Sequence, residues 1–191
     1  LTIDELRAVT QSCASSPGRL MVGFNRRFAP MITQIRNHFQ DRSTPLMVHY
    51  RVNAGQVPAT NWVHDPVEGG GRILGEVCHF VDLEHYLVGA PPRSVYATRL
   101  PAQGANVMGD DNVMATLEFA DGSRGGVLYT ALAADSIPKE FIEVMGDGKA
   151  ATLDNYRSLS LYHGTRKKVT RSRQDKGHEA EFSALINSIL Q

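Results

Sequence analysis

Three polar side chains recur at three-residue spacing directly after a run of glycines. The segment GGGRILGEVCHFVD places Glu76, His79 and Asp82 behind Gly69–Gly71. Residues three apart share one face of a helix, and a histidine beside carboxylates can shuttle protons near neutral pH. The glycines would leave backbone N–H groups at the helix start, where anionic or hydroxyl-rich ligands bind. The pattern predicts an acid/base helix at a ligand site, although an ordinary half-exposed helix can have the same spacing.

Other polar side chains are weaker candidates. Arg26 and Arg27 follow an apolar segment and could bind a carboxylate or phosphate, or one of them could make only a surface ion pair. Trp62 lies in a loop over 55–71 that is rich in Gly, Pro and Asn, where it could stack on a sugar ring or anchor the loop. The basic run over 166–173 is typical of a solvated edge strand.

Metal and nucleotide chemistry are less favoured. Cys78, His79 and His85 lie close together, but adjacent side chains on a helix diverge by about 100°, and no C-x-x-C or H-E-x-x-H motif completes a zinc site. GDGKAA, Gly146–Ala151, matches the dinucleotide fingerprint G-x-G-x-x-A. That fingerprint must open a helix, whereas the residues after it alternate as in a strand, which predicts a hairpin turn.

Composition limits the partners. The 191 residues carry 20 basic and 20 acidic side chains, so no overall field attracts nucleic acid or an anionic membrane surface. Cys13 and Cys78 make no disulfide framework, which favours a reducing, cytoplasmic location. No apolar run approaches the ~20 residues that span a bilayer. We expect small-molecule ligands or copies of the chain as partners and, because the sequence begins at Leu1, a longer parent protein.

The elements that position these residues follow from periodicity and turn residues. Helices are predicted over 2–14 from a Thr2–Glu5 capping box, from Pro30 to about 39, over 73–88, and over 179–190. Strands are predicted over 19–24, 46–53, 93–100, 112–119, 124–132, 139–146, 150–155 and 159–164. Successive strands joined by turns predict an α+β fold, with a large, mostly antiparallel open sheet and helices on one face.

The order LMVGFNRRFAP, NWVHDPVEGGGRILGEVCHFVDLEHYLVG and FIEVMGDGKAATLDN resembles the C-terminal part of the Gfo/Idh/MocA family, the glucose-fructose oxidoreductases and inositol dehydrogenases, over nearly the whole chain. The resemblance implies a glyceraldehyde-3-phosphate-dehydrogenase-like C-terminal fold, with an upstream Rossmann domain that binds NAD or NADP. It also implies a sugar, polyol or nucleotide-sugar substrate and a sheet that packs against another subunit. Residues 1–28 would be the end of the dinucleotide-binding domain, a helix plus a strand, and 29–191 the substrate-binding and oligomerisation domain.

The family pattern is approximately G-G-G-x-L-x-D-x-G-x-H-x-x-D. His79 matches its His and Asp82 its last Asp, but Gly75 replaces the first Asp. Glu76 comes one residue later, a helical step of about 100°, and so does not simply substitute. The resemblance makes His79 the candidate catalytic acid/base. The candidate substrate-binding residues are Arg27, Trp62, Gly70, Gly71, Arg72, Glu76 and Asp82.

The resemblance also says what the chain lacks. The family has a catalytic lysine in an E-K-P motif, and LTIDEL resembles the segment just after it. We therefore expect the parent protein to be an NAD(P)-dependent dehydrogenase, and the chain alone to be inactive, with no cofactor or metal bound. The alternative is a non-catalytic module whose sheet forms a dimer interface, with Gly75 marking a lapsed active site.

Overall fold

Eight strands form one open sheet in the computed structural model, which describes residues 2–101 and 109–190. The strand order is β2-β3-β4-β1-β5-β6-β7-β8, and only the β1–β4 pair is parallel. The strands are β1 (Met47–Asn53), β2 (Pro92–Arg99), β3 (Val113–Phe119), β4 (Arg124–Thr130), β5 (Glu140–Gly146), β6 (Lys149–Asp154), β7 (Ser158–His163) and β8 (Arg166–Arg171). The predicted α+β architecture with a mostly antiparallel sheet is confirmed.

Local sequence explains the strand pairing. Alternation along β1 buries Val48, Tyr50 and Val52 against the helices. The β3–β4 hairpin forms through Ala120–Ser123, as predicted. Between β5 and β6 the turn residues Asp147 and Gly148 have φ of 53° and 67°, which is the backbone twist that favours a tight hairpin. The GDGKAA segment is therefore a strand connection, as the sequence indicates.

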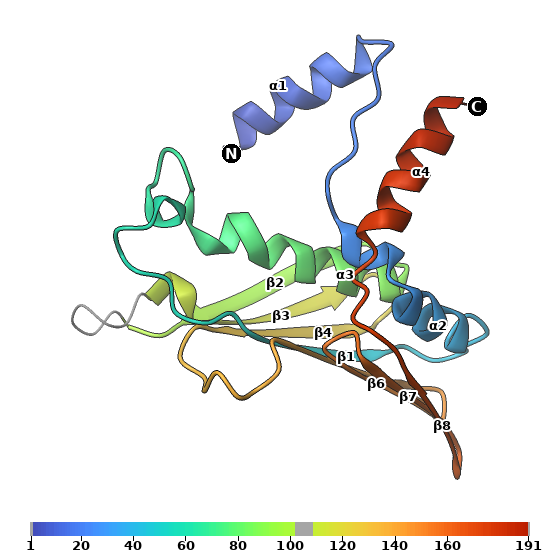
Figure 1. Cartoon of the computed structure of the whole chain (residues 1–191). Helices are drawn as coiled ribbons and strands as arrows, with labels where there is room; N and C mark the ends of the chain where they lie inside the picture. Colours follow the sequence, from blue (N-terminus) through green and yellow to red (C-terminus); the bar gives the residue numbers. More distant parts are fainter. Residues whose placement is uncertain (1, 102–108, 191) are drawn as a thin grey trace.

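Two helices cover one face of the sheet (Figure 1). Helix α2 (Pro30–His38) begins at Pro30 and buries Met31, Ile32 and Ile35. Helix α3 (Cys78–Val88) adds Phe80 and further apolar side chains to the same core. A widened turn, η3 (Ile73–Val77), precedes α3, and short 3-10 turns occur at η1 (Asn25–Phe28), η2 (Trp62–His64) and η5 (Gly109–Asp111).

The first and last helices project away from the sheet (Figure 1). Helix α1 (Ile3–Ala14) has the predicted Thr2–Glu5 capping box but no buried residue. Helix α4 (His178–Leu190) buries only Glu181, and Phe182, Ile186 and Ile189 on it are more than half exposed. Both helices therefore form where predicted, and both leave apolar side chains without a partner in the described chain.

The strand predicted over residues 19–24 is wrong. The segment RLMVGF forms no strand, and Leu20 and Val22 are about 60% exposed. A strand needs a neighbour to accept its backbone hydrogen bonds, and among the described residues the eight sheet strands pair only with one another. Apolar character alone cannot supply this missing partner.

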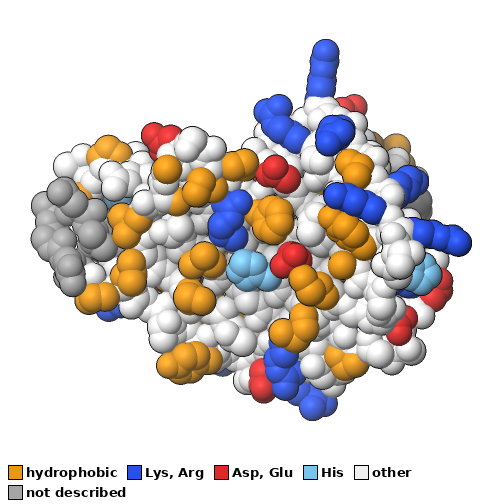
Figure 2. Space-filling view, turned by 90° about the horizontal axis from the view of Figure 1, so that it is seen from below, with side chains coloured by type: hydrophobic (Ala, Val, Ile, Leu, Met, Phe, Trp, Pro, Cys, Tyr) orange, Lys and Arg blue, Asp and Glu red, His pale blue; other side chains and the backbone are white. Residues whose placement is uncertain are grey.

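The other face of the sheet carries no helix. Figure 2 shows this face, where hydrophobic side chains lie among basic, acidic and histidine side chains. Met47 and Met114 are each 62% exposed on it, and Met145 is 44% exposed. The residues that alternate with them along β1 and β3 are buried under the helices.

Candidate active site

The candidate site lies where three central strands end or begin. Parallel β1 and β4 end at the same edge of the sheet, and antiparallel β5 begins there. The loop over 55–71 leaves from the end of β1, and η3 leads from it into α3. Strand pairing thus brings residues near 54, 129 and 139 together, although they are far apart in sequence. The η3 turn adds residue 76 to this group.

The glycine run shapes the loop. Gly70 and Gly71 have φ of 66° and 84°, in the left-handed region that favours glycine, and a Cβ at Gly69 would lie 2.5 Å from the Val63 carbonyl oxygen. The N–H groups of Gly69 and Gly70 donate to the Asp65 carbonyl at 2.9 and 2.8 Å. The expected ligand mouth of free glycine N–H groups is therefore wrong for these two residues, because the loop's own backbone uses them.

The three polar residues of the helix bind different partners. Asp82 accepts two hydrogen bonds from Arg27, one of them from Nε at 2.6 Å. Glu76 lies in the widened η3 turn, which departs from the α-helical spacing assumed in the prediction. His79 stacks edge-on against Phe24, with ring centroids 5.5 Å apart. The predicted helix is confirmed, but its polar stripe is not one hydrogen-bonded unit.

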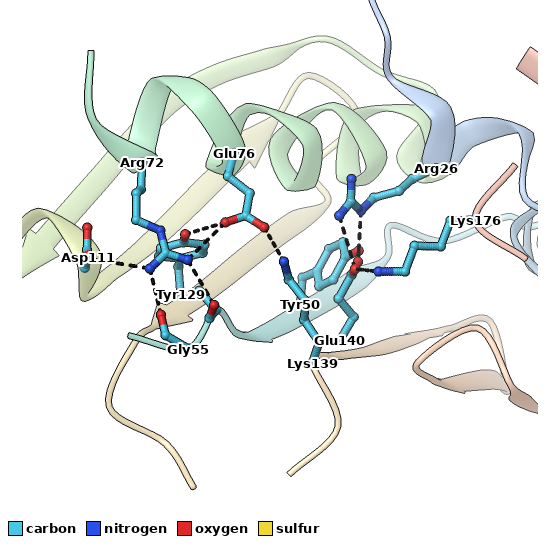
Figure 3. Close-up of polar contacts among 11 residues, drawn as sticks. Arg26, Tyr50, Gly55, Arg72, Glu76, Asp111, Tyr129, Lys139, Glu140 and Lys176 are labelled. Atoms are coloured by element: carbon cyan, nitrogen blue, oxygen red, sulfur yellow. Dashed lines mark hydrogen bonds and ion pairs between the residues drawn. The ribbon is translucent and has the colours of Figure 1, made fainter. Parts of the chain in front are cut away.

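A first cluster surrounds the Glu76 carboxylate (Figure 3). Tyr129 donates its hydroxyl to Oε2 at 2.6 Å, Lys139 donates to Oε1 at 2.6 Å, and Arg72 Nη2 lies 3.3 Å from Oε2. Burial raises the pKa of Glu76, but the hydrogen bonds from Lys139 and Tyr129 outweigh burial and lower it. Glu76 is therefore an ionised carboxylate with its acceptors in use.

Arg72 is held by protein groups. Its guanidinium donates to the carbonyls of Gly55 and Ala54 at 2.7 and 3.0 Å and contacts Asp111 at 3.4 Å, and the residue is only 5% exposed. Arg72 thus fixes the start of the 55–71 loop to η3. These contacts support a positioning role rather than the predicted direct contact with substrate.

A second cluster surrounds Glu140 at the start of β5 (Figure 3). Arg26 donates to both carboxylate oxygens at 2.9 and 3.1 Å, Lys176 donates at 2.5 Å, and Tyr50 donates its hydroxyl. Burial raises the pKa of Glu140, but Arg26 and Lys176 outweigh burial and lower it to about 2. The surface ion pair considered from sequence does not form for Arg26 or Arg27. Arg26 is buried together with its partner Glu140, and Asp82, the partner of Arg27, is buried.

His79 lies within electrostatic reach of both clusters. Burial and the charge of Arg26 lower its pKa, while Glu76, Asp82 and Glu140 oppose that shift. The residue is half-buried, and no group in the described part of the chain makes a hydrogen bond to its buried Nδ1 atom. The imidazole is therefore neutral near pH 7 and can accept a proton.

One predicted site residue, Trp62, lies outside both clusters, and three residues of the clusters were not predicted from sequence. Trp62 lies in η2 and is 64% exposed, so it does not anchor the loop to the core. Sequence reasoning missed Tyr129, Lys139 and Glu140, because no motif contains them. The signal that could have found them is their position at strand ends, but it becomes usable only once the β1–β4 and β1–β5 pairings are known.

No cofactor or metal site emerges within the described ranges. No group of three or more His, Cys, Asp and Glu side chains there could hold a metal ion. Gly146–Ala151 does not open a helix, so this segment does not fit a dinucleotide pyrophosphate. Over residues 2–101 and 109–190, no helix has the length and apolar character needed to cross a bilayer. Cys13 and Cys78 are both free thiols.

Comparison with known proteins gives the family. Residues 43–188 match the family described as the oxidoreductase family, C-terminal alpha/beta domain, of the Gfo/Idh/MocA proteins. The chain therefore belongs to this oxidoreductase family and contains its C-terminal domain. It is similar to inositol 2-dehydrogenase of Rhizobium meliloti, with 28% identity over 176 residues that cover 90% of this chain and 52% of the relative.

Solved structures share the fold. An inositol dehydrogenase homolog from Azotobacter vinelandii, complexed with NAD+, has a TM-score of 0.76 and 20% identity, covering 93% of this chain and 51% of that one. UDP-N-acetylglucosamine 3-dehydrogenase from Acidithiobacillus ferrooxidans has a TM-score of 0.78 and 20% identity, covering 100% of this chain and 59% of that one. The chain thus spans about half the length of the relatives it matches.

Proposed function

We propose that the chain is the substrate-binding and oligomerisation domain of an NAD(P)-dependent oxidoreductase that oxidises a hydroxyl of a sugar, polyol or nucleotide-sugar. The observation that carries the proposal is His79, a neutral, half-buried imidazole beside two ordered charge clusters in a chain of this family. Relatives named as inositol and nucleotide-sugar dehydrogenases support the substrate class. We expect the chain alone to be inactive, because in this proposal an upstream domain binds the dinucleotide.

In this proposal the residues of the chain bind substrate and manage its proton. His79 accepts the proton of the reacting hydroxyl, for which a neutral imidazole is required. Arg26 and Glu140 form an ion pair in the core and act on the site through it. Arg72 holds the loop over 55–71, which places the exposed Trp62 over the ligand. The nicotinamide, which takes up the hydride, comes from a domain outside the described residues.

The projecting helices support an upstream domain. Helices α1 and α4 project on the helix-covered side of the sheet (Figure 1), and their exposed apolar side chains have no partner within residues 2–101 and 109–190. Burying such surface is worth roughly 25 cal/mol per Å². We assign these two helices to contacts with the dinucleotide-binding domain, of which residues 1–28 would be the end. Residues 25–28 are nevertheless tied to the sheet domain through Arg26 and Asn25.

The helix-free sheet face supports a homodimer. Met47, Met114 and Met145 are exposed on it, and hydrophobic side chains lie among charged ones over the face (Figure 2); exposed apolar surface rimmed by polar residues marks interaction sites. The free thiols of Cys13 and Cys78 support a reducing, cytoplasmic setting.

The test is turnover by the full-length protein that the gene encodes. Purified protein is mixed with NAD+ or NADP+ and a panel of myo-inositol, glucose and UDP-N-acetylglucosamine, and absorbance of the reduced nicotinamide is followed. We expect turnover with at least one member. The alternative, a non-catalytic sheet-mediated dimer module, is favoured by Gly75, which removes the family's first carboxylate. A stable dimer that is inert across the panel would select that alternative.

A further inference from the structure

Lys139 is a polar group at this edge of the sheet that no motif identifies. Resting on the proposed function, we propose that Lys139 binds substrate and selects neutral hydroxyl groups over anionic ones. Its ammonium, held by Glu76, would donate hydrogen bonds to hydroxyl oxygens beside the reacting carbon. Four features of the site support this role: the donors around Glu76, the exposure of Lys139, the contacts that connect it to the surroundings of His79, and the charge balance of the cluster.

Glu76 holds the ammonium without competing for ligand. Its Oε1 atom accepts from Lys139 at 2.6 Å, while Oε2 accepts from Tyr129 at 2.6 Å and from Arg72 at 3.3 Å. Both oxygens are thus engaged by protein donors. Glu76, one residue after the position of the family's first Asp, therefore fixes a donor instead of acting as the base.

Lys139 retains donors for a ligand. An ammonium has three N–H donors, and within the described residues Nζ donates to one partner, Glu76. The side chain is 41% exposed, in contrast to Arg72, whose side chain is 5% exposed. Of these two cations on Glu76, Lys139 is the one that can reach a molecule outside the protein.

Both clusters connect Lys139 to the surroundings of His79. Its partner Glu76 precedes His79 by three residues, and its chain neighbour Glu140 binds Arg26. The charges of Glu76, Glu140 and Arg26 all act on the His79 imidazole. In this inference, a polyol whose reacting hydroxyl meets His79 has a neighbouring hydroxyl at the Glu76–Lys139 pair.

The charge balance of the cluster selects neutral ligands. Arg72 and Lys139 contribute two positive charges, and Glu76 and Asp111 contribute two negative charges, within one connected set of contacts. Within this cluster the charges of Lys139 and Arg72 are balanced, so Lys139 donates hydrogen bonds without adding a net positive charge that would recruit a carboxylate or phosphate. A polyol or an uncharged sugar ring fits this chemistry better than its acid or its phosphate ester.

The test uses the full-length protein and four variants. Lys139→Met removes the donors, Lys139→Gln keeps an uncharged donor, and Glu76→Gln leaves the ammonium without its counter-charge. Lys168→Met, on exposed β8, is the matched control. Initial rates are measured with the neutral substrates myo-inositol and glucose and with three anionic ones, UDP-N-acetylglucosamine, glucuronate and glucose 6-phosphate, and melting temperatures report folding.

For the best neutral substrate, we expect Lys139→Met to raise KM by about tenfold to a hundredfold with a smaller change in kcat, because a hydrogen bond from a charged donor is lost. Lys139→Gln should raise KM less than Lys139→Met does. Glu76→Gln should raise kcat/KM for glucuronate relative to kcat/KM for the neutral substrate. Unchanged KM in Lys139→Met, or a wild-type preference for an anionic analogue, overturns the inference while the proposed function stands. No wild-type turnover on any panel member overturns both.

Discussion

At the residue scale, one buried carboxyl has no role in the proposed chemistry. Glu84 on α3 is fully buried, and its Oε1 atom accepts the Gly126 N–H at 3.2 Å, while Oε2 has no partner among the residues that the structure describes. A Cβ at Gly125 would overlap Oε2, so the glycine makes the space that the carboxyl fills. The residues paired with Gly125, Val48 and Leu117, are apolar. Burial raises the pKa of Glu84 to about 8.

This pKa predicts a pH-dependent stability. Because the pKa of Glu84 in the folded protein exceeds its ordinary value of 4.5, the folded chain binds more protons than the unfolded chain between about pH 4.5 and about pH 8. Stability from this group is complete below that range and is lost as pH rises through it. Glu84→Gln removes the ionisation, so we expect it to stabilise the protein by a few kcal/mol near pH 9 and much less near pH 5.

Chemical denaturation of the full-length protein at the two pH values measures this effect. Glu179→Gln on exposed α4 is the matched control and should leave the difference between the two pH values unchanged. If the free energy of unfolding of Glu84→Gln changes with pH as that of wild type does, Glu84 is already ionised in the folded protein across this range.

At the element scale, the sequence predicted what local rules determine. The Thr2–Glu5 capping box, Pro30 at a helix start and the alternation from Leu46 all mark elements that form as expected. These signals act within a few residues, so no knowledge of the fold is needed to read them. The β3–β4 hairpin was predictable for the same reason.

Elements that depend on distant partners were not predictable in this way. RLMVGF has strand-like residues but no neighbour, and the widened η3 turn around Gly75 alters the helical phase that placed Glu76 with His79. Lys139 and Glu140 join the site only because β5 pairs with β1. The candidate site was therefore found in part, through α3, while the strand side of the site was missed.

At the scale of the whole molecule, the sheet has one covered and one open face. The open face predicts a dimer that a charge can disrupt. Met114→Glu, on exposed β3, places a carboxylate in the proposed interface, so we expect it to shift the full-length protein from dimer to monomer at micromolar concentration. Sedimentation velocity measures this shift. Val67→Glu, at a loop residue that is 91% exposed, should remain dimeric.

A monomeric wild-type protein at the same concentration would refute the sheet-face interface. A Met114→Glu protein that sediments as the wild-type dimer would place the interface elsewhere on the molecule. Both outcomes leave the assignment of His79 untouched, because the imidazole lies on the helix-covered side of the sheet, with α3.

The central claim is that the His79 imidazole faces bound substrate and takes its proton. The most direct measurement is kcat/KM against pH for the full-length wild type, for His79→Asn and for His163→Asn on β7 as the control. Because burial and Arg26 lower the pKa of His79, wild-type activity should fall on acidification with a midpoint below pH 6.5. His79→Asn should lose that limb and about 10²- to 10⁴-fold in rate. Wild-type rates and an unchanged acidic limb in His79→Asn would contradict the account.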